Sequence, residues 1–302
     1  MPNAVRSKKS RPSVSIVGSG RLGTALALAL SSSGYSVQAL VSQGLRSAKK
    51  AAALVRGRPL SLTGSELDRL PASKIILIVT PDDEIARTAT KLASSRISSP
   101  RNRVVLHTSG ALSSSVLKPL ASLGFHVGSL HPLVSVSDPE TGQKRLRGAF
   151  YCIEGDFIAT RTARALVKDL GGRSFKIPSE NKPLYHAAAV MASGHVLALY
   201  DLASDMLVHC GLKRAEALRI LLPLLESTVS NLSHADPSRA LTGTFARGDL
   251  ATVRRHLEAL SKDRLTQARE IYKLLGSQSL ELALRRGLEP KLVKQIMQAL
   301  RR

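Results

Sequence analysis

Residues 12–30 constrain the fold more than any other stretch of this 302-residue chain. Residues 13–17 form an apolar run typical of a buried strand, and residues 24–30 are rich in Ala and Leu, which predicts a helix. The glycines between them have the G-x-G-x-x-G spacing, which permits a tight turn, close approach to a pyrophosphate and close helix–strand packing. This order predicts a dinucleotide site, the alternative being a turn that binds nothing. The predicted cofactor contacts are Gly18, Ser19, Gly20, Arg21, Leu22 and Gly23.

The end of the second predicted strand, residues 35–41, indicates which dinucleotide binds. An NAD-specific site usually has Asp or Glu there, to bind the ribose hydroxyls. This chain has no acid at that point, and Ser42 and Arg46 could hold a 2′-phosphate instead. The prediction is therefore NADP rather than NAD, although Arg46 could also lie on a solvated helix face.

Three further runs read as strands, at residues 74–80, 103–107 and 125–130. Ligands of an open α/β sheet bind at the carboxyl ends of its strands. We therefore expect Thr80 and Pro81 to line the cofactor cleft. We expect His107, Ser109 and His131 to bind substrate, while the alternative for each histidine is a hydrogen bond to loop carbonyls. A metal site built from His107, His131 and His186 lacks an acidic ligand, so no metal is predicted.

The alternation of strands and helices stops near Pro178, and the rest of the chain has a helical pattern. The predicted fold class is α/β, with a doubly wound parallel sheet at residues 13–178 and an all-α domain at 179–302, after a disordered basic tail at 1–12. A helix predicted from residue 181 to 210 is apolar almost all round. We expect it to be buried on every side, in a bundle core or a homodimer interface, rather than in a membrane.

The start of that helix carries the candidate catalytic residues. Lys182 and His186 are four residues apart, which places both on one helical face. Either could transfer a proton or hold an anion, and the alternative is a solvated lysine and a core histidine. In the loop at 241–249, Thr242 and Arg247 are candidates for binding a substrate carboxylate.

Composition excludes some classes of protein. The formal net charge is +22, which suggests nucleic acid as a partner, but the charge is spread along the chain and aromatic residues make up only 3%. A base-stacking platform is therefore not expected, and the basic surface favours small anionic ligands. The two cysteines lack a metal-binding spacing, and with no apolar leader they indicate a cytoplasmic protein.

Several short motifs occur in an order that resembles one known family. From about residue 13 the chain resembles Rossmann-like proteins whose C-terminal half is a helical domain of unknown function. It is similar, more distantly, to the 6-phosphogluconate dehydrogenase-like superfamily. The resemblance implies an NAD(P)-binding domain, an interleaved helical domain and frequent dimers. The motifs are Gly18–Gly23, Thr80–Glu84, His107–Gly110, His131–Leu133, Glu154–Asp156, Tyr185–Ala189, Leu241–Gly243 and Arg247–Asp249.

The β-hydroxyacid dehydrogenases of this superfamily carry a catalytic lysine where Lys182 stands, followed four residues later by Asn, which His186 replaces here. We therefore expect an NADP-dependent oxidoreductase that acts on a C=O or C=N bond of a small anionic substrate. Two alternatives are a non-catalytic NAD(P)-binding sensor or scaffold and a basic nucleic-acid-binding protein.

Overall fold

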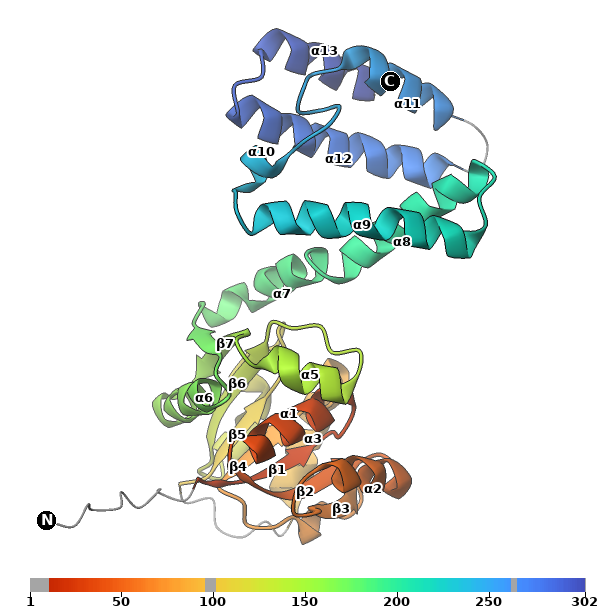
Figure 1. Ribbon diagram of the computed structural model, residues 1–302. Coiled ribbons are helices and arrows are strands. Elements are labelled where there is room, and N and C mark those ends of the chain that lie inside the picture. Colours follow the sequence, from red (N-terminus) through yellow and green to blue (C-terminus); the bar gives the residue numbers. More distant parts are fainter. Residues whose placement is uncertain (1–10, 96–101, 262–264, 302) are drawn as a thin grey trace, which may run out of the picture. The chain divides into compact units, whose positions relative to one another are not determined.

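The computed structural model describes residues 11–95, 102–261 and 265–301 (Figure 1). The chain forms two compact units, Met1–Ser193 and Gly194–Arg302, which we call the sheet unit and the helical unit. The border lies later than the change of sequence pattern at residue 178, because the first helix after that point belongs to the sheet unit. Most of the predicted basic tail lies outside the described residues. Arg11, at its end, is paired with Asp169 at 2.5 Å.

The sheet unit is built on eight strands in the order β3-β2-β1-β4-β5-β6-β7-β8. The parallel strands from β1 to β6 agree with the predicted fold class, and the short edge strand β3 escaped the sequence prediction. The bounds are β1 Ser13–Val17, β2 Ser36–Ser42, β3 Leu60–Thr63, β4 Ile75–Ile78, β5 Val104–His107, β6 His126–Pro132, β7 Phe150–Gly155 and β8 Arg173–Phe175.

The sheet is mostly parallel, with a reversal of strand direction between β6 and β7. Strand β7 runs antiparallel to β6, with Pro132 opposite Tyr151 and Gly128 opposite Gly155. The chain leaves β6 and starts β7 at the same edge of the sheet, so no crossover to the other edge is made. Strand β8 is parallel to β7.

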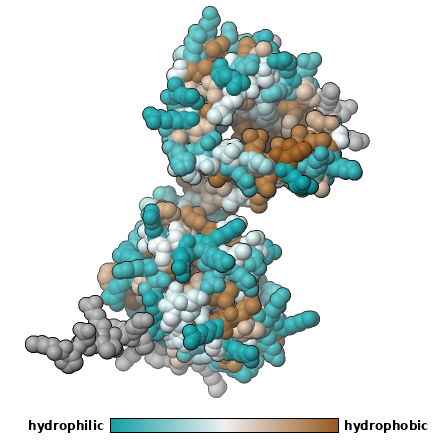
Figure 2. Space-filling model, in the orientation of Figure 1, coloured by the Kyte–Doolittle hydropathy of each residue, from teal (hydrophilic) through white to brown (hydrophobic). Residues whose placement is uncertain are grey.

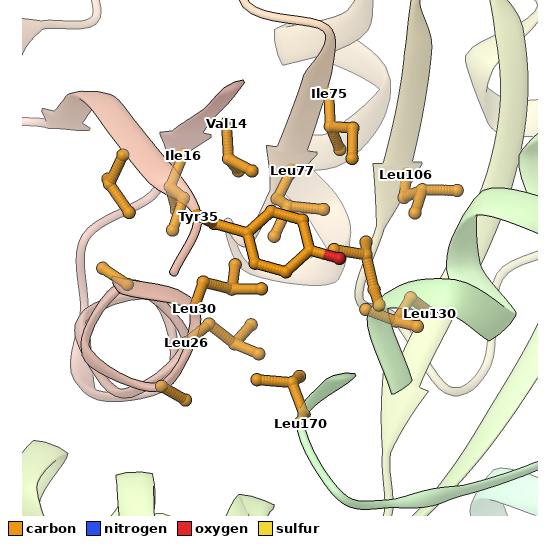
Figure 3. Packing of buried hydrophobic residues seen from close by; sticks show 14 of the residues in the cluster. Val14, Ile16, Leu26, Leu30, Tyr35, Ile75, Leu77, Leu106, Leu130 and Leu170 are labelled. Atoms are coloured by element: carbon orange, nitrogen blue, oxygen red, sulfur yellow. The ribbon is translucent and has the colours of Figure 1, made fainter. Parts of the chain in front are cut away.

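Alternate residues of the central strands face two separate cores, since successive side chains of a strand point to opposite faces. In β4, Ile75 and Leu77 face one core, whereas Ile76 and Ile78 face the other. Figure 3 shows the first core, in which the Tyr35 ring packs among leucines and isoleucines. The Tyr35 hydroxyl donates to Asp169 at 2.6 Å, so its polar end is satisfied.

Helices cover both faces of the sheet. One core includes residues of α1 (Arg21–Ser32), α2 (Leu45–Leu54), α5 (Pro139–Leu146) and α6 (Phe157–Asp169), and the other includes α3 (Asp82–Ser94) and α4 (Lys118–Ala121). Helix α5 is not among the elements predicted from the sequence. Asp138 caps it by accepting from the N–H groups of Glu140 and Thr141, and Pro139 occupies its first turn. Short 3-10 turns lie at Leu67–Arg69, Ser114–Leu117 and Ser179–Asn181.

The last helix of the sheet unit, α7, is Lys182–Met191, and the helical unit begins with α8, Gly194–His209. The single helix predicted from 181 to 210 is therefore two helices, separated at Ala192 and Ser193. The other helices are α9 (Arg214–Leu232), α10 (Pro237–Ala240), α11 (Leu250–Ala259), α12 (Thr266–Arg285) and α13 (Pro290–Arg301). Residues from α11, α12 and α13 share a small core that includes Val253, Leu280 and Ile296.

The expectation that residues 181–210 are buried on every side is wrong for the single chain. The stretch Ser179–His209 is long and apolar enough to cross a membrane, with a mean hydropathy of 1.2, but only 6% of its most apolar window is buried. In α8 the side chain of Leu197 is 67% exposed, and in α9 that of Leu224 is 64% exposed. Figure 2 shows apolar surface gathered on the helical unit. The apolar sequence pattern predicts burial, but the single chain leaves most of these residues exposed.

Candidate functional site

Two positions of the glycine loop after β1 accept only glycine, Gly18 for its backbone conformation and Gly23 for lack of space. Gly18 has a φ of +106°, and a Cβ there would lie 2.5 Å from the Val79 carbonyl carbon. A Cβ on Gly23 would lie 1.9 Å from the Gly18 carbonyl oxygen, which explains why α1 approaches the loop so closely. A Cβ on Gly20 would meet nothing within 4 Å. Gly18 and Gly23 shape the turn, and Gly20 faces open space.

A cavity of about 520 Å³ lies above this loop at the carboxyl edge of the sheet. Of the predicted cofactor residues, the structure brings Gly18, Ser19, Gly20, Ser42, Thr80 and Pro81 into its wall. The predicted contacts Arg21, Leu22, Gly23 and Arg46 are not among the lining residues.

One wall of this cavity escaped the sequence analysis. It consists of Glu84, Arg87, Thr88 and Lys91, which all lie on α3. Their spacing of three and four residues places them on one face of a helix. The sequence after Pro81 could therefore have predicted a polar helical face at the cofactor cavity. Arg87 donates to Glu84 at 2.8 Å through Nε and is ion-paired with it. Lys91, the other cation of this wall, forms no ion pair with a described residue.

The cavity fits the phosphates and ribose of a dinucleotide. Helix α1 begins without a side-chain cap and without an acid in its first turn, so its free N–H groups and positive dipole end suit a phosphate. The hydroxyls of Ser19 and Ser42 are hydrogen-bonded to each other beside it. The buried hydroxyl oxygen of Thr80 has no hydrogen-bond partner among the described residues, as expected of a group that binds a ligand.

The loop after β5 is held by the side chains that were expected to bind substrate. The His107 Nδ1 accepts from the Ser109 N–H at 3.2 Å, so its proton is on Nε2, which donates to the Ser113 carbonyl at 3.2 Å. Burial lowers the pKa of His107 to about 3, and the nearby Lys182 charge adds to this. The Ser109 hydroxyl donates to Asp82 at 2.7 Å. Both residues are buried and committed to the loop, so this structure favours the alternative for His107, hydrogen bonding to loop carbonyls.

Lys182 is completely buried, although it opens α7. Its ammonium donates to the Ser109 carbonyl at 3.2 Å and to the Ser129 hydroxyl at 2.9 Å. The Ser129 hydroxyl donates in turn to Glu154 at 3.4 Å. Burial lowers the pKa of Lys182 from its ordinary value. The ammonium therefore fastens α7 to β6 and to the loop after β5, and it has no exposed surface for a ligand.

The other two candidate histidines, His131 at the end of β6 and His186 on α7, lie against each other. His131 Nδ1 is hydrogen-bonded to the Tyr185 hydroxyl at 2.7 Å. The His131 and His186 rings meet edge to face, with centroids 5.6 Å apart. Burial lowers the pKa of His131 to about 4, and the His186 and Lys182 charges add to this. His186 Nδ1 is buried without a hydrogen-bond partner among the described residues.

This histidine cluster lies next to the cofactor cavity within the sheet unit. Asp82, which accepts from Ser109, directly follows Pro81 of the cavity wall. No group of three or more His, Cys, Asp or Glu side chains that could hold a metal occurs in the part of the chain that the structure describes. Tyr185 was not predicted to belong to the site, although it stands next to His186 in the motif Tyr185–Ala189.

The remaining predicted site residues, Thr242 and Arg247, belong to the helical unit. They line a cavity of about 420 Å³ together with Arg286 of the α12 C-terminus. The Arg286 guanidinium donates to the Leu241 carbonyl at 3.1 Å, which holds it beside the loop. Two guanidinium groups thus border one cavity whose lining contains no carboxylate.

Comparison with protein families identifies both halves of the chain. A Rossmann-like domain matches residues 2–132, and a domain of unknown function (DUF2520) matches residues 149–279. These matches confirm the resemblance that the motifs indicate. No curated protein sequence matches the chain.

Solved structures with the same fold cover nearly the whole chain. A Bacteroides fragilis protein, provisionally described as an NADP oxidoreductase, is 22% identical over 90% of this chain and 99% of its own, with a TM-score of 0.71. A Thermotoga maritima protein is 24% identical over 96% of this chain and 100% of its own, with a TM-score of 0.64. Pyrroline carboxylate reductase from Plasmodium falciparum, solved with NADP bound, is 13% identical over 95% of this chain and 98% of its own, with a TM-score of 0.57. At these identities the likeness establishes the fold.

Proposed function

We propose that the protein is an NADP-dependent oxidoreductase that acts on a C=O or C=N bond of a small anionic substrate. The observation that carries this proposal is that the glycine cradle and the histidine cluster share one edge of the sheet, joined through Pro81, Asp82 and Ser109. The fold shared with proteins described as an NADP oxidoreductase and a pyrroline carboxylate reductase supports it.

The bound dinucleotide would supply the hydride. Gly18, Ser19 and Gly20 would hold its pyrophosphate at the start of α1, and Thr80 and Pro81 would face its ribose. No acid lines the end of β2, where Ser42, Gln43, Gly44 and Ser47 border the cavity, so hydroxyl and backbone groups remain for a 2′-phosphate. This composition of the wall supports NADP over NAD.

Proton transfer is assigned to His186. Its Nδ1 is buried, lacks a hydrogen-bond partner within the described part of the chain and belongs to a ring that meets His131, whereas Lys182 is enclosed by protein hydrogen bonds. The original pairing of Lys182 with His186 as two acid/base groups is therefore revised. Lys182 acts as a positioning residue. The pKa of His131 is lowered mainly by burial, and the His186 and Lys182 charges add to this.

The cavity of the helical unit is proposed separately as a site for a small carboxylate. Arg247, Arg286 and Thr242 offer two planar cationic forks and a hydroxyl, which suit a carboxylate. A thermal-shift screen with small carboxylates should give stabilisation that Arg247→Gln and Arg286→Gln each abolish. The matched control is Arg285→Gln, because Arg285 neighbours Arg286 and does not line the cavity.

The experiment that tests the function is oxidation of NADPH with a panel of small keto acids and cyclic imines. One member of the panel should be reduced faster with NADPH than with NADH. His186→Asn should lower kcat by about 100-fold with little change in NADPH affinity. Tight NADPH binding with no turnover across the panel would favour the non-catalytic sensor instead.

We also propose a homodimer formed through the helical unit, in the cytoplasm. The exposed leucines of α8 and α9 support it, because contiguous exposed apolar surface marks an interaction site. The two free cysteines, Cys152 and Cys210, suit a reducing compartment.

A further inference from the structure

The cluster at the end of β6 contains a tyrosine to which no role has yet been given. Tyr185 lies one residue before His186 on α7, and its hydroxyl is 2.7 Å from Nδ1 of His131. Its ring meets the His131 ring edge to face, with centroids 5.6 Å apart, and also contacts the Phe175 ring, with centroids 5.8 Å apart. These two contacts help to hold the Tyr185 hydroxyl at the His131 nitrogen.

The chemistry of the two groups decides which one donates. Burial keeps the pKa of His131 near 4 and raises that of Tyr185 above its ordinary value, so both are neutral at pH 7. A phenol is a stronger acid than a neutral imidazole N–H, and an imidazole nitrogen is a better acceptor than a phenolic oxygen. The Tyr185 hydroxyl therefore donates to Nδ1, and the single proton of His131 is on Nε2.

Gly110 shows where that N–H lies. A Cβ on Gly110 would come within 2.9 Å of His131 Nε2 and 2.5 Å of His186 Nδ1. Both nitrogens thus approach the Gly110 backbone, where only glycine leaves room for the two rings. Nε2 of His131 and Nδ1 of His186, which has no hydrogen-bond partner among the described residues, are therefore close enough to face the same ligand atom.

We propose that Tyr185 is a positioning residue that fixes His131 as the Nε2–H tautomer, so that His131 donates a hydrogen bond to the oxygen or nitrogen of the bond that receives the hydride. His131 stays neutral and keeps its proton, because losing it would leave an anionic imidazole. The proton that completes the reduction comes from the imidazolium form of His186, which is left as a neutral imidazole. The role toward substrate rests on the proposed function, whereas the tautomer does not.

The test is nitrogen NMR of the full-length protein with ¹⁵N-labelled histidine at pH 7, with the His131 signals identified by their loss in His131→Gln. We expect a pyridine-type Nδ1 and a pyrrole-type Nε2 for His131. In Tyr185→Phe, both signals should move toward the average of the two tautomers. A pyrrole-type Nδ1 in the unchanged protein, or His131 signals unaffected by Tyr185→Phe, would overturn the inference.

The helical unit supplies a matched control. There the Tyr272 hydroxyl lies 2.8 Å from Nδ1 of His256, in the same kind of pair. Tyr272→Phe should move the His256 signals and leave those of His131 in place. The wild-type spectrum alone assigns the tautomer if Tyr185→Phe does not fold. Because the spectrum needs no turnover, an inactive protein with the expected tautomer would count against the proposed function and not against the tautomer.

Discussion

The two units treat their apolar residues in opposite ways. In the sheet unit, successive residues of β4 fill two cores, and all four are buried. In the helical unit, α8 and α9 also carry many apolar residues, yet Leu197 and Leu224 stay largely exposed. A run of apolar residues in the sequence therefore does not by itself show whether the same chain buries them. The sheet unit buries the residues of β4 within its own cores, whereas the helical unit leaves large leucines exposed.

The largest effect is expected at Gly23, where the sheet unit has no spare room. Gly23→Ala would place a methyl group 1.9 Å from the Gly18 carbonyl oxygen, so α1 must move away from the loop. We expect a loss of about 2–4 kcal/mol in the free energy of unfolding and of about 100-fold in NADPH affinity. Urea unfolding and fluorescence titration measure the two.

Gly287 of the helical unit provides the contrast. Its φ is +98°, but a Cβ there would meet nothing within 4 Å. Gly287→Ala should therefore cost about 1–2 kcal/mol, from its backbone conformation alone, and leave NADPH affinity unchanged. Equal losses at both glycines would remove the difference in packing between the units.

The second prediction concerns the exposed face of the helical unit. Leu197→Glu combined with Leu224→Glu should raise the dimer dissociation constant by about 100-fold, because a carboxylate would be buried without a partner. Light scattering after size exclusion measures the mass. The matched control is Leu274→Glu, since this leucine is also highly exposed but lies on α12.

A wild-type chain that is monomeric at every concentration would contradict the proposed dimer. If that monomer binds to phospholipid vesicles, a membrane covers the apolar face instead.

The third prediction uses the buried histidines of the sheet unit. The pKa values of His107 and His131 are lowered to about 3 and about 4, so these side chains are neutral in the folded protein. Between pH 7 and those values the unfolded chain binds more protons, and stability falls as the pH falls. From pH 7 to pH 6 the two together should remove about 1.4 kcal/mol. Urea unfolding of the wild type and of a His107→Asn, His131→Asn variant measures this slope, which should flatten in the variant.

The smallest effect is expected at Lys91 on the cofactor cavity. Lys91→Ala should weaken NADPH binding by about twofold to fivefold at low salt, with less effect on NADH, because an exposed cation attracts the extra phosphate weakly. Arg46→Ala is the matched control, since Arg46 does not line the cavity. A larger loss with Arg46→Ala would restore Arg46 as the residue that selects NADP.

The sequence was sufficient for the parts of the fold that depend on local pattern. The glycine spacing and the aliphatic runs locate β1, β4 and the cofactor cradle, because strand period and glycine conformation are local properties. The reversal of β7 was not predictable, since strand direction depends on where the connection returns. Helix α5 was missed because its eight residues are largely polar, although Asp138 and Pro139 marked its start.

The candidate site also contains residues that the sequence predicts and residues that it does not. Residues near the ends of strands, such as Thr80 and His131, were found because chain order places them at one edge. The burial of Lys182 could not be foreseen, because a lysine at a helix start usually faces solvent. The cavity face of α3 and the contact from Tyr185 to His131 depend on how helices settle on the sheet, which no short motif records.

The break at Ala192 and Ser193 does not coincide with the border between the two family domains. Lys182, Tyr185 and His186 precede the break and fold with the sheet unit. They nevertheless lie in the domain of unknown function, which spans residues 149–279, and not in the Rossmann-like domain, which ends at residue 132. The part of the chain that folds together and the part that recurs together in related proteins are therefore different.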